Sequence, residues 1–83
     1  MQACLYILFS QALNKYYIGS TTDIERRLAE HNRGKEKFTR TGIPWLLVYS
    51  EIFEELNQAR QREFYIKRMK SKIFIEKLIT SAG

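Results

Sequence analysis

The chain has 83 residues, of which 45% are apolar, 28% are charged and one is a cysteine, and its net charge is +5. This length supports a single domain, residues 1–83, built from two layers of secondary structure, and the apolar content excludes an intrinsically disordered chain. The lone cysteine, Cys4, excludes an intramolecular disulfide and a multi-cysteine zinc site in one chain, and we expect it to be a buried thiol in a reducing, cytoplasmic compartment.

Residues 4–19 predict an antiparallel hairpin, because two short apolar runs, CLYILFS and KYYIG, flank the turn-forming residues QALN. The opening run, MQACLYILF, is too short to span a bilayer and carries no basic leader, so we expect neither a membrane segment nor a signal peptide. A turn centred near residues 11 and 12 would place Tyr6 nearly opposite Tyr17, with both phenols on one face of the sheet. The other face would carry the apolar side chains of Leu5, Ile7, Phe9 and Ile18.

A helix is predicted over residues 23–33. Thr22 and Glu25 match a capping box, in which each side chain bonds the backbone of the other residue, and Gly34 follows as a natural stop. Residues 35–44 are polar and contain a glycine and the only proline, so we expect a loop there.

The rest of the chain predicts one strand and two helices. WLLVYSEIF, residues 45–53, is typical of a third strand, and its unbroken apolar start predicts that both faces of this strand are covered. A helical period begins near Leu56, and Ser71 is placed to cap a last short helix. The order is β-β-α-β-α-α, and the fold class is α/β of the α+β type, with a three-stranded antiparallel sheet flanked by helices.

The positive charge is concentrated in the last third of the chain. Residues 1–56 contain seven Lys or Arg and seven Asp or Glu, which cancel, whereas residues 57–83 contain seven Lys or Arg and two Glu, which gives 7 − 2 = +5. A one-sided basic surface is typical of proteins that bind a polyanion, most often nucleic acid, and Arg60, Lys67 and Lys70 are the candidate contacts. The alternative is a solvated basic helix face with no ligand.

Three polar side chains occupy positions that border the predicted core. Arg27 and His31 are four residues apart, so they lie on the helix face that also carries apolar residues. Glu63 lies on the apolar stripe of the next helix, where a carboxylate needs a partner, a metal ion or a raised pKa. Each also has a purely structural explanation, which for Glu63 is an ion pair with Arg60 or Lys67.

Together with Tyr6 and Tyr17, these three residues form a set that favours phosphodiester chemistry. The set holds two phenols, a guanidinium, an imidazole and a single carboxylate, so it lacks the paired acids of a two-metal site and suits cleavage with one metal ion. We expect all five side chains to line a common pocket. Because tyrosine is frequent in any strand, neither phenol alone indicates a function, and the prediction depends on all five residues together.

These residues resemble the GIY-YIG nuclease family, over essentially the whole chain and with short, stand-alone bacterial members as the nearest likeness. Residues 17–19, Tyr-Ile-Gly, match the second triad of the family, and the phrase YIGSTTDIERRLAEH places Arg27 where the family has its arginine. Glu63 in ARQREFYIK matches the family glutamate on a later helix. Residues 4–6, Cys-Leu-Tyr, keep only the tyrosine of the first triad, and every asparagine of the chain precedes the glutamate, whereas many relatives carry one after it.

The resemblance implies a metal-dependent endonuclease that hydrolyses DNA. One Mg²⁺ or Mn²⁺ ion would be held by Glu63. Tyr17 would take a proton from the attacking water, and His31 would accept or relay that proton. Arg27 would pair with the phosphate and stabilise the charge that grows on its oxygens, while Tyr6 would orient the water or the phosphate. Either tyrosine fits the role of the base.

Further implications concern the substrate. Ser20 and Thr21 would contact the backbone of the DNA, and Gly19 would allow its close approach. Branched or damaged DNA in a bacterial repair process is the expected substrate class. Two alternatives stay open, namely a nucleic-acid-binding module that does not cleave and a small domain that binds an acidic protein.

Overall fold

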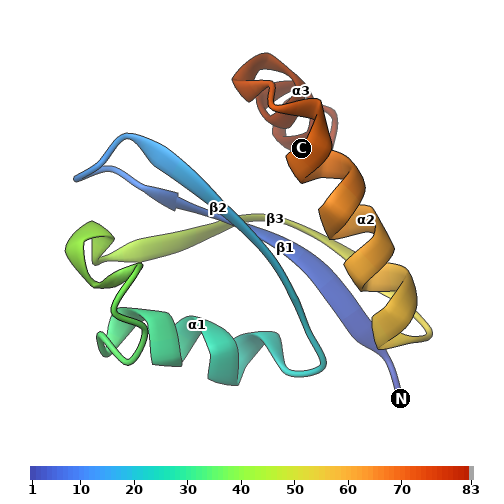
Figure 1. Ribbon diagram of the computed structural model, residues 1–83, viewed down its shortest axis with the longest axis horizontal. Coiled ribbons are helices and arrows are strands. Elements are labelled where there is room, and N and C mark those ends of the chain that lie inside the picture. Colours follow the sequence, from blue (N-terminus) through green and yellow to red (C-terminus); the bar gives the residue numbers. More distant parts are fainter. Residues whose placement is uncertain (83) are drawn as a thin grey trace.

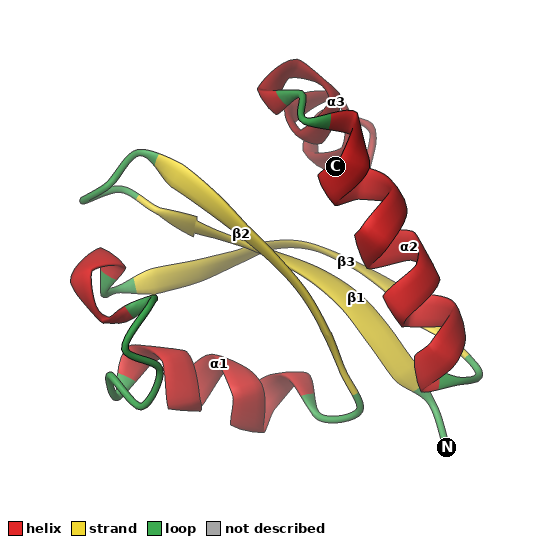
Figure 2. Ribbon diagram, in the orientation of Figure 1, coloured by secondary structure: helices red, strands yellow, loops and turns green. Residues whose placement is uncertain are grey.

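The chain folds into a three-stranded sheet with helices on both faces, and the computed structural model describes residues 1–82 (Figures 1 and 2). The elements in this range are β1 (Ala3–Ser10), β2 (Lys15–Thr21), α1 (Ile24–Asn32), the 3₁₀ turn η1 (Arg40–Gly42), β3 (Trp45–Phe53), α2 (Leu56–Met69) and α3 (Lys72–Ala82). This order confirms the predicted β-β-α-β-α-α arrangement and the α+β class.

The sheet is antiparallel throughout, with strand order β2-β1-β3. β1 is therefore the central strand, and β2 and β3 are its edges. α1 covers one face of the sheet, and α2 and α3 lie on the other (Figure 1). β1 can serve both layers because consecutive side chains of a strand point to opposite faces.

Two small cores result, one on each face of the sheet. The core under α2 and α3 is formed by Leu5, Ile7, Ile18, Ile66 and Ile75. The core under α1 is formed by Tyr6, Leu8 and Trp45. Cys4 is buried, as predicted. Over residues 1–82, none of the helices combines the length and the apolar character that crossing a bilayer requires.

The hairpin register differs from the predicted one by two residues. Tyr6 lies opposite Gly19, and Tyr17 lies opposite Leu8. The turn occupies residues 11–14 and closes through Asn14, whose φ of 53° is left-handed. Because the faces of a strand alternate with a period of two, this shift leaves every side chain on its predicted face. Tyr6 and Tyr17 therefore still share the face under α1.

β3 is not covered on both faces, so the prediction from its apolar start is wrong. Leu46 and Leu47 are 55% and 41% exposed, and β3 is an edge strand. The strand that is covered on both faces is β1, as its central place requires. A short apolar run does not distinguish the two cases, because burial depends on which strands and helices lie next to it.

The helix caps agree with the sequence at α3 and differ by one residue at α1. Asp23, rather than Thr22, caps α1, since its carboxylate accepts a hydrogen bond of 3.1 Å from the amide of Arg26. The hydroxyl of Ser71 accepts from the amide of Phe74 over 3.1 Å, which confirms the predicted cap of α3.

Candidate active site

The Tyr6 side chain extends from β1 across β2 and lies over Gly19. A Cβ atom at position 19 would collide with the hydroxyl end of the Tyr6 ring. The ring itself is buried, with Tyr6 only 1% exposed. The glycine of the second triad therefore makes room for the tyrosine of the first, and the close approach of a substrate to Gly19 stays a prediction.

A hydrogen-bonded chain begins at the Tyr6 phenol. Its oxygen lies 3.3 Å from Nε2 of His31, and Nδ1 of His31 lies 2.9 Å from Oγ1 of Thr39. The Thr39 hydroxyl donates in turn to the carbonyl oxygen of Glu36, 3.5 Å away. A hydroxyl that donates there accepts from Nδ1–H, so we assign the tautomer in which Nε2 of His31 accepts from the Tyr6 hydroxyl.

Burial sets the protonation state of this pair. His31 is fully buried, and burial together with the positive charge of Arg27 lowers its pKa. Burial also raises the pKa of Tyr6 to about 12, although the Arg27 guanidinium opposes this rise. At neutral pH the two groups are therefore a phenol and a neutral imidazole, with the Nε2 lone pair accepting the hydrogen bond of the Tyr6 hydroxyl.

Tyr17 packs beside the pair through its ring. The centroid of its ring lies 4.8 Å from that of His31, edge-on, and 6.1 Å from that of Trp45. The sequence-based interpretation joined His31 to Tyr17, whereas the hydrogen bond joins it to Tyr6. The two-residue shift in register explains the difference, because it moves Tyr17 along β2 to a position opposite Leu8.

Arg27 is held in place by two carboxylates. Its Nη1 lies 3.2 Å from Oε1 of Glu30, and its Nη2 lies 2.8 Å from Oε1 of Glu36. Burial works against the charge, but the interactions with Glu36 and Tyr6 outweigh it and raise the pKa of the guanidinium. The Arg27 side chain is 25% exposed, as its predicted place at the border of the core implies.

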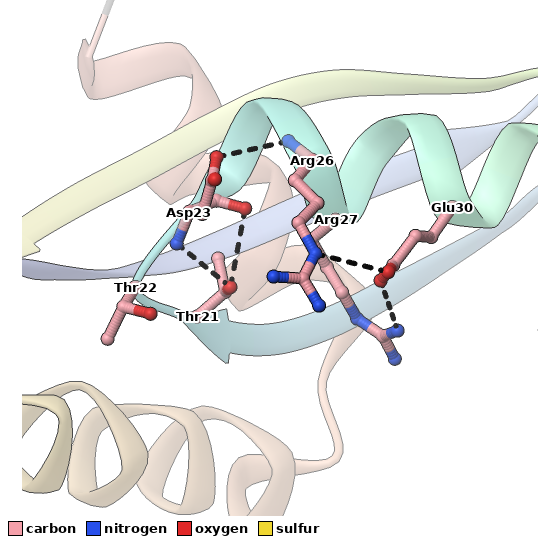
Figure 3. Close-up of a pocket in the computed structure, with 6 residues that line it drawn as sticks. All are labelled: Thr21, Thr22, Asp23, Arg26, Arg27 and Glu30. Atoms are coloured by element: carbon pink, nitrogen blue, oxygen red, sulfur yellow. Dashed lines mark hydrogen bonds and ion pairs between the residues drawn. The ribbon is translucent and has the colours of Figure 1, made fainter.

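A pocket opens beside Arg27, where the end of β2 meets the first turns of α1. It is lined by Thr21, Thr22, Asp23, Arg26, Arg27 and Glu30 (Figure 3). Figure 3 shows the guanidinium groups of Arg26 and Arg27 turned toward the Glu30 carboxylate. Of the predicted site residues, this pocket contains Arg27 and Thr21, so it is not the common pocket expected for all five catalytic candidates.

Glu63 reaches the site from the opposite face of the sheet. It belongs to α2, which lies across the sheet from α1 (Figure 1). The Ser20 hydroxyl donates to its Oε1 over 2.6 Å, and the Lys67 ammonium lies 2.6 Å from its Oε2. Ser20 directly follows Gly19 on the edge strand, and the charge of Glu63 adds to the burial that raises the pKa of Tyr6. Glu63 therefore reaches the edge strand at the residue next to Gly19.

The residues predicted to contact nucleic acid have different surroundings. Ser20 and Lys67 are both bonded to Glu63, so the ion pair that offered a structural explanation for this carboxylate is present. The Thr21 hydroxyl accepts from the backbone amide that follows Thr22, over 3.1 Å. The other two candidates, Arg60 and Lys70, are exposed on α2 and at its C-terminal cap.

Sequence reasoning missed three side chains that hold the site together, namely Glu30, Glu36 and Thr39. The cations around the Glu30 carboxylate are Arg26, Arg27 and Lys35. The hydrogen bond from Arg27 holds the pKa of Glu30 below its usual range. Its position three residues after Arg27 was a usable signal, because such pairs meet on a helix. Glu36 and Thr39 lie in the segment predicted as a loop, where no period marks them.

Comparisons with known proteins identify the family and agree with the fold. The family model of the GIY-YIG catalytic domain matches residues 2–77. A UPF0213 protein of Staphylococcus haemolyticus is 47% identical over 55 residues, which cover 65% of this chain and 67% of that protein. A UPF0213 protein of Streptococcus pneumoniae is 43% identical over 70 residues, which cover 83% of this chain and 70% of that protein.

A solved structure of a related protein has a similar fold. The solution NMR structure of a UPF0213 protein from Bacillus halodurans is 33% identical and superposes with a TM-score of 0.63. The match covers 100% of this chain and 87% of that one. The matched domain, the relatives and the fold together show that the chain belongs to the GIY-YIG family of nuclease domains.

Proposed function

We propose that the protein is a divalent-metal-dependent endonuclease that hydrolyses phosphodiester bonds in DNA. Its membership of a nuclease family supports the class of reaction. The observation that carries the proposal is the packing at Gly19, where the Tyr6 phenol lies over the glycine with its oxygen 3.3 Å from Nε2 of His31, and where the next residue, Ser20, donates to the Glu63 carboxylate over 2.6 Å. A phenol, a carboxylate and a guanidinium are groups that phosphodiester hydrolysis with one metal ion needs.

Arg27 is proposed to bind the scissile phosphate. Glu30 and Glu36 hold its guanidinium in one orientation, so little rearrangement is needed when a phosphate arrives. The side chain is partly exposed to the pocket at the end of β2, which gives a phosphate a route to it. A fixed guanidinium forms paired hydrogen bonds with phosphate oxygens and stabilises the charge that grows on them.

Tyr6 is proposed as the base, with His31 as the acceptor of its proton. Because burial raises the pKa of Tyr6 to about 12, little phenolate exists at neutral pH. The phenol can take a proton from water only if its own proton leaves, and Nε2 of His31 lies 3.3 Å away to receive it. Tyr17, which the sequence favoured for this role, is proposed to orient the imidazole through its ring contact.

Glu63 is proposed to hold the metal ion. Within residues 1–82, no three His, Cys, Asp or Glu side chains gather into a metal-binding group, so a cage such as a zinc site does not fit. A single carboxylate oriented by Ser20 fits Mg²⁺ or Mn²⁺, because Mg²⁺ commonly keeps several waters and uses one or two carboxylates together with substrate phosphates. Such an ion supplies Lewis-acid polarisation of the phosphate. Lys67 has to leave Oε2 when it binds.

The substrate class follows from the kind of contact that these groups make. The proposed contacts of Arg27, Thr21 and the basic helix residues are all to phosphate, and phosphate contacts carry no sequence information. We therefore propose that DNA is selected by its structure, with branched or damaged DNA in cytoplasmic repair as the expected class.

A cleavage assay tests the proposal. The purified protein is incubated with nicked, branched and linear DNA in Mg²⁺, in Mn²⁺ and in chelator. We expect metal-dependent cleavage that falls at least a hundredfold in Arg27→Ala, Glu63→Gln and Tyr6→Phe, since loss of one group that stabilises transition-state charge costs about 10²–10³ in rate. Glu54→Gln and Tyr65→Phe are matched controls, because both residues are exposed and lie outside the site.

The outcomes separate the alternatives. Cleavage that survives Glu63→Gln would mean that this carboxylate does not hold the metal ion. Binding that weakens with salt but is never followed by cleavage, with any of the metal ions, would favour the non-catalytic binding module.

A further inference from the structure

A second basic feature lies away from the Arg27 pocket, where the start of β2 faces the junction of α2 and α3. Its lining includes four lysines from two separate segments, with an aromatic ring and a hydroxyl between them. We call it the lysine groove, and its defining residues are Lys15, Tyr16, Lys67, Lys70, Ser71 and Lys72. The sequence indicated a basic last third with Lys67 and Lys70 as candidate contacts, and the structure adds the charge of Lys15 and the ring of Tyr16 from the hairpin.

The charge of the groove is largely uncompensated. Lys67 pairs with Glu63, but Lys15, Lys70 and Lys72 take part in none of the ion pairs formed among residues 1–82. A further acid whose charge reaches the groove is Glu76, which adds to the burial that raises the pKa of Tyr16. Four ammonium groups around one groove repel one another, and an anionic ligand removes that repulsion.

The backbone at Lys70 also points to a function for the groove. Lys70 caps α2 with a left-handed φ of 48°, a conformation in which helices usually place glycine. Asn14, the other non-glycine residue with positive φ within residues 1–82, lines the same groove. Two of the residues that line the groove thus hold a backbone conformation that glycine would adopt with less strain, which marks the groove as a place to look for function.

The groove continues into the candidate active site through Lys67. Its ammonium lies 2.6 Å from the Glu63 carboxylate, and the same side chain lines the groove. A polymer that passes the Glu63 carboxylate along α2 would therefore meet Lys67 first and the other three lysines next. The groove has a volume of about 290 Å³. This is at the lower limit of pockets that enclose small molecules, about 300–1,000 Å³, and suits a segment of a longer chain.

We propose that the lysine groove binds the phosphate backbone of a nucleic-acid strand that extends from the candidate active site past Glu63. This inference rests on the proposed function for the identity of the polymer. Lysine ammonium groups contact successive phosphates, and Tyr16 with the apolar residues Ile18 and Ile75 provides a surface for the sugar or base between them.

The test compares two double variants that lose the same charge. Lys15→Gln/Lys72→Gln removes two groove lysines, and Lys37→Gln/Lys77→Gln removes two exposed lysines that do not line it. Binding of a fluorescein-labelled 20-nucleotide single strand is followed by fluorescence anisotropy in chelator, from 50 to 300 mM salt, so that cleavage does not interfere. Circular dichroism verifies that both variants are folded, as the exposure of all four lysines predicts.

We expect the groove variant to bind about tenfold more weakly than the control variant at 150 mM salt. Its plot of log affinity against log salt should be less steep by about 1.4, because each lost phosphate contact on a single strand removes about 0.7. Lys15→Arg/Lys72→Arg should bind like the unmodified protein, since it keeps both charges.

Each other result has one meaning. If the two glutamine variants lose the same amount of DNA affinity, the groove proposal is wrong, because the loss then depends on overall charge and not on position. If the unmodified protein cleaves DNA but the groove variant binds the strand as tightly as the control variant, the groove proposal is wrong and the nuclease proposal stands. A protein that neither binds the strand nor cleaves DNA overturns both.

Discussion

Gly19 lies directly opposite Tyr6 in the β1–β2 ladder, and the hydroxyl end of the Tyr6 ring fills the space that a side chain at position 19 would need. The two residues that give the family triads their final glycine and final tyrosine are thus a single packing unit. The same contact places the phenol beside the edge strand, where the next residue, Ser20, donates to the Glu63 carboxylate.

Gly19→Ala should displace the Tyr6 ring. We expect a loss of about 1–3 kcal/mol in the free energy of unfolding, as for other overpacked core positions, together with loss of nuclease activity. Urea denaturation measures the first effect. The matched test repeats the substitution in a Tyr6→Leu background, where the colliding hydroxyl end is missing, and most of the cost should disappear. Equal costs in the two backgrounds would show that the ring is not the obstacle.

Stability should fall as the pH drops below about 6.5, the ordinary pKa of histidine. His31 is buried and its pKa is lowered, chiefly by burial and next by Arg27. Below pH 6.5 the unfolded chain therefore binds a proton at His31 that the folded chain does not bind. The stabilisation of the fold by neutral His31 is fully present above pH 6.5 and is lost as the pH falls, by at most about 1.4 kcal/mol per pH unit.

The matched variant for this prediction is His31→Gln, which cannot titrate. Urea unfolding at pH 7.5, 6.5 and 5.5 should give a flatter dependence of the unfolding free energy for the variant than for the unmodified protein. Parallel curves would mean that another group is responsible for the acid sensitivity.

Glu51 and Arg62 join β3 to α2, and their loss should affect stability more than DNA binding. The guanidinium makes two hydrogen bonds to the carboxylate, of 2.9 and 3.1 Å, and Tyr49 adds a third. Burial works to raise the pKa of Glu51, but these donors outweigh it and hold the pKa low. The stabilisation should therefore be present above about pH 4.5 and be lost at lower pH.

Glu51→Gln is expected to lower the free energy of unfolding by about 1–2 kcal/mol at pH 7, because it weakens a bidentate pair that is only partly exposed. Chemical denaturation at pH 7 and pH 3.5 measures the change, which should be smaller at the lower pH. An undiminished change at pH 3.5 would contradict the assignment of the effect to the ionised carboxylate.

Lys67 should compete with a metal ion for Glu63, since its ammonium lies 2.6 Å from Oε2. An exposed ion pair of this kind contributes about 0.2–1 kcal/mol, so Lys67→Gln should tighten Mn²⁺ binding by about 1.4- to fivefold. Isothermal titration calorimetry with Mn²⁺ alone gives the affinity without any need for activity. Glu63→Gln should abolish the same signal, and tight binding by that variant would place the ion elsewhere.

Lys70→Gly should make the protein more stable and a poorer DNA binder. Glycine adopts the left-handed φ of 48° without strain, which we expect to be worth about 1 kcal/mol, or about 4–8 °C in Tm for a domain of this size. Thermal unfolding and fluorescence anisotropy are measured on the same preparation. Lys70→Asn is the matched control, because asparagine also tolerates this conformation but likewise removes the charge. Unchanged DNA affinity in both variants would show that Lys70 does not bind DNA in the groove.

Local patterns in the sequence were sufficient for the order of the helices and strands and for the faces of the hairpin and of α1, but not for the burial of β3. The period of two in β1 placed Tyr6 and Tyr17 on one face of the sheet even though the predicted register was two residues off. The spacing of four placed Arg27 and His31 on one side of α1. These features depend on neighbours within a few residues, so the sequence alone determines them.

Only the tertiary structure decided which of these side chains meet. Ser20 and Glu63 are 43 residues apart, and their hydrogen bond forms because α2 packs against the face of the sheet opposite α1 and reaches the edge of β2. The partner of His31 depended on the register of a hairpin, and the lysine groove on the approach of a turn to a helix junction. Such contacts depend on how whole layers pack, and no local period in the chain encodes that.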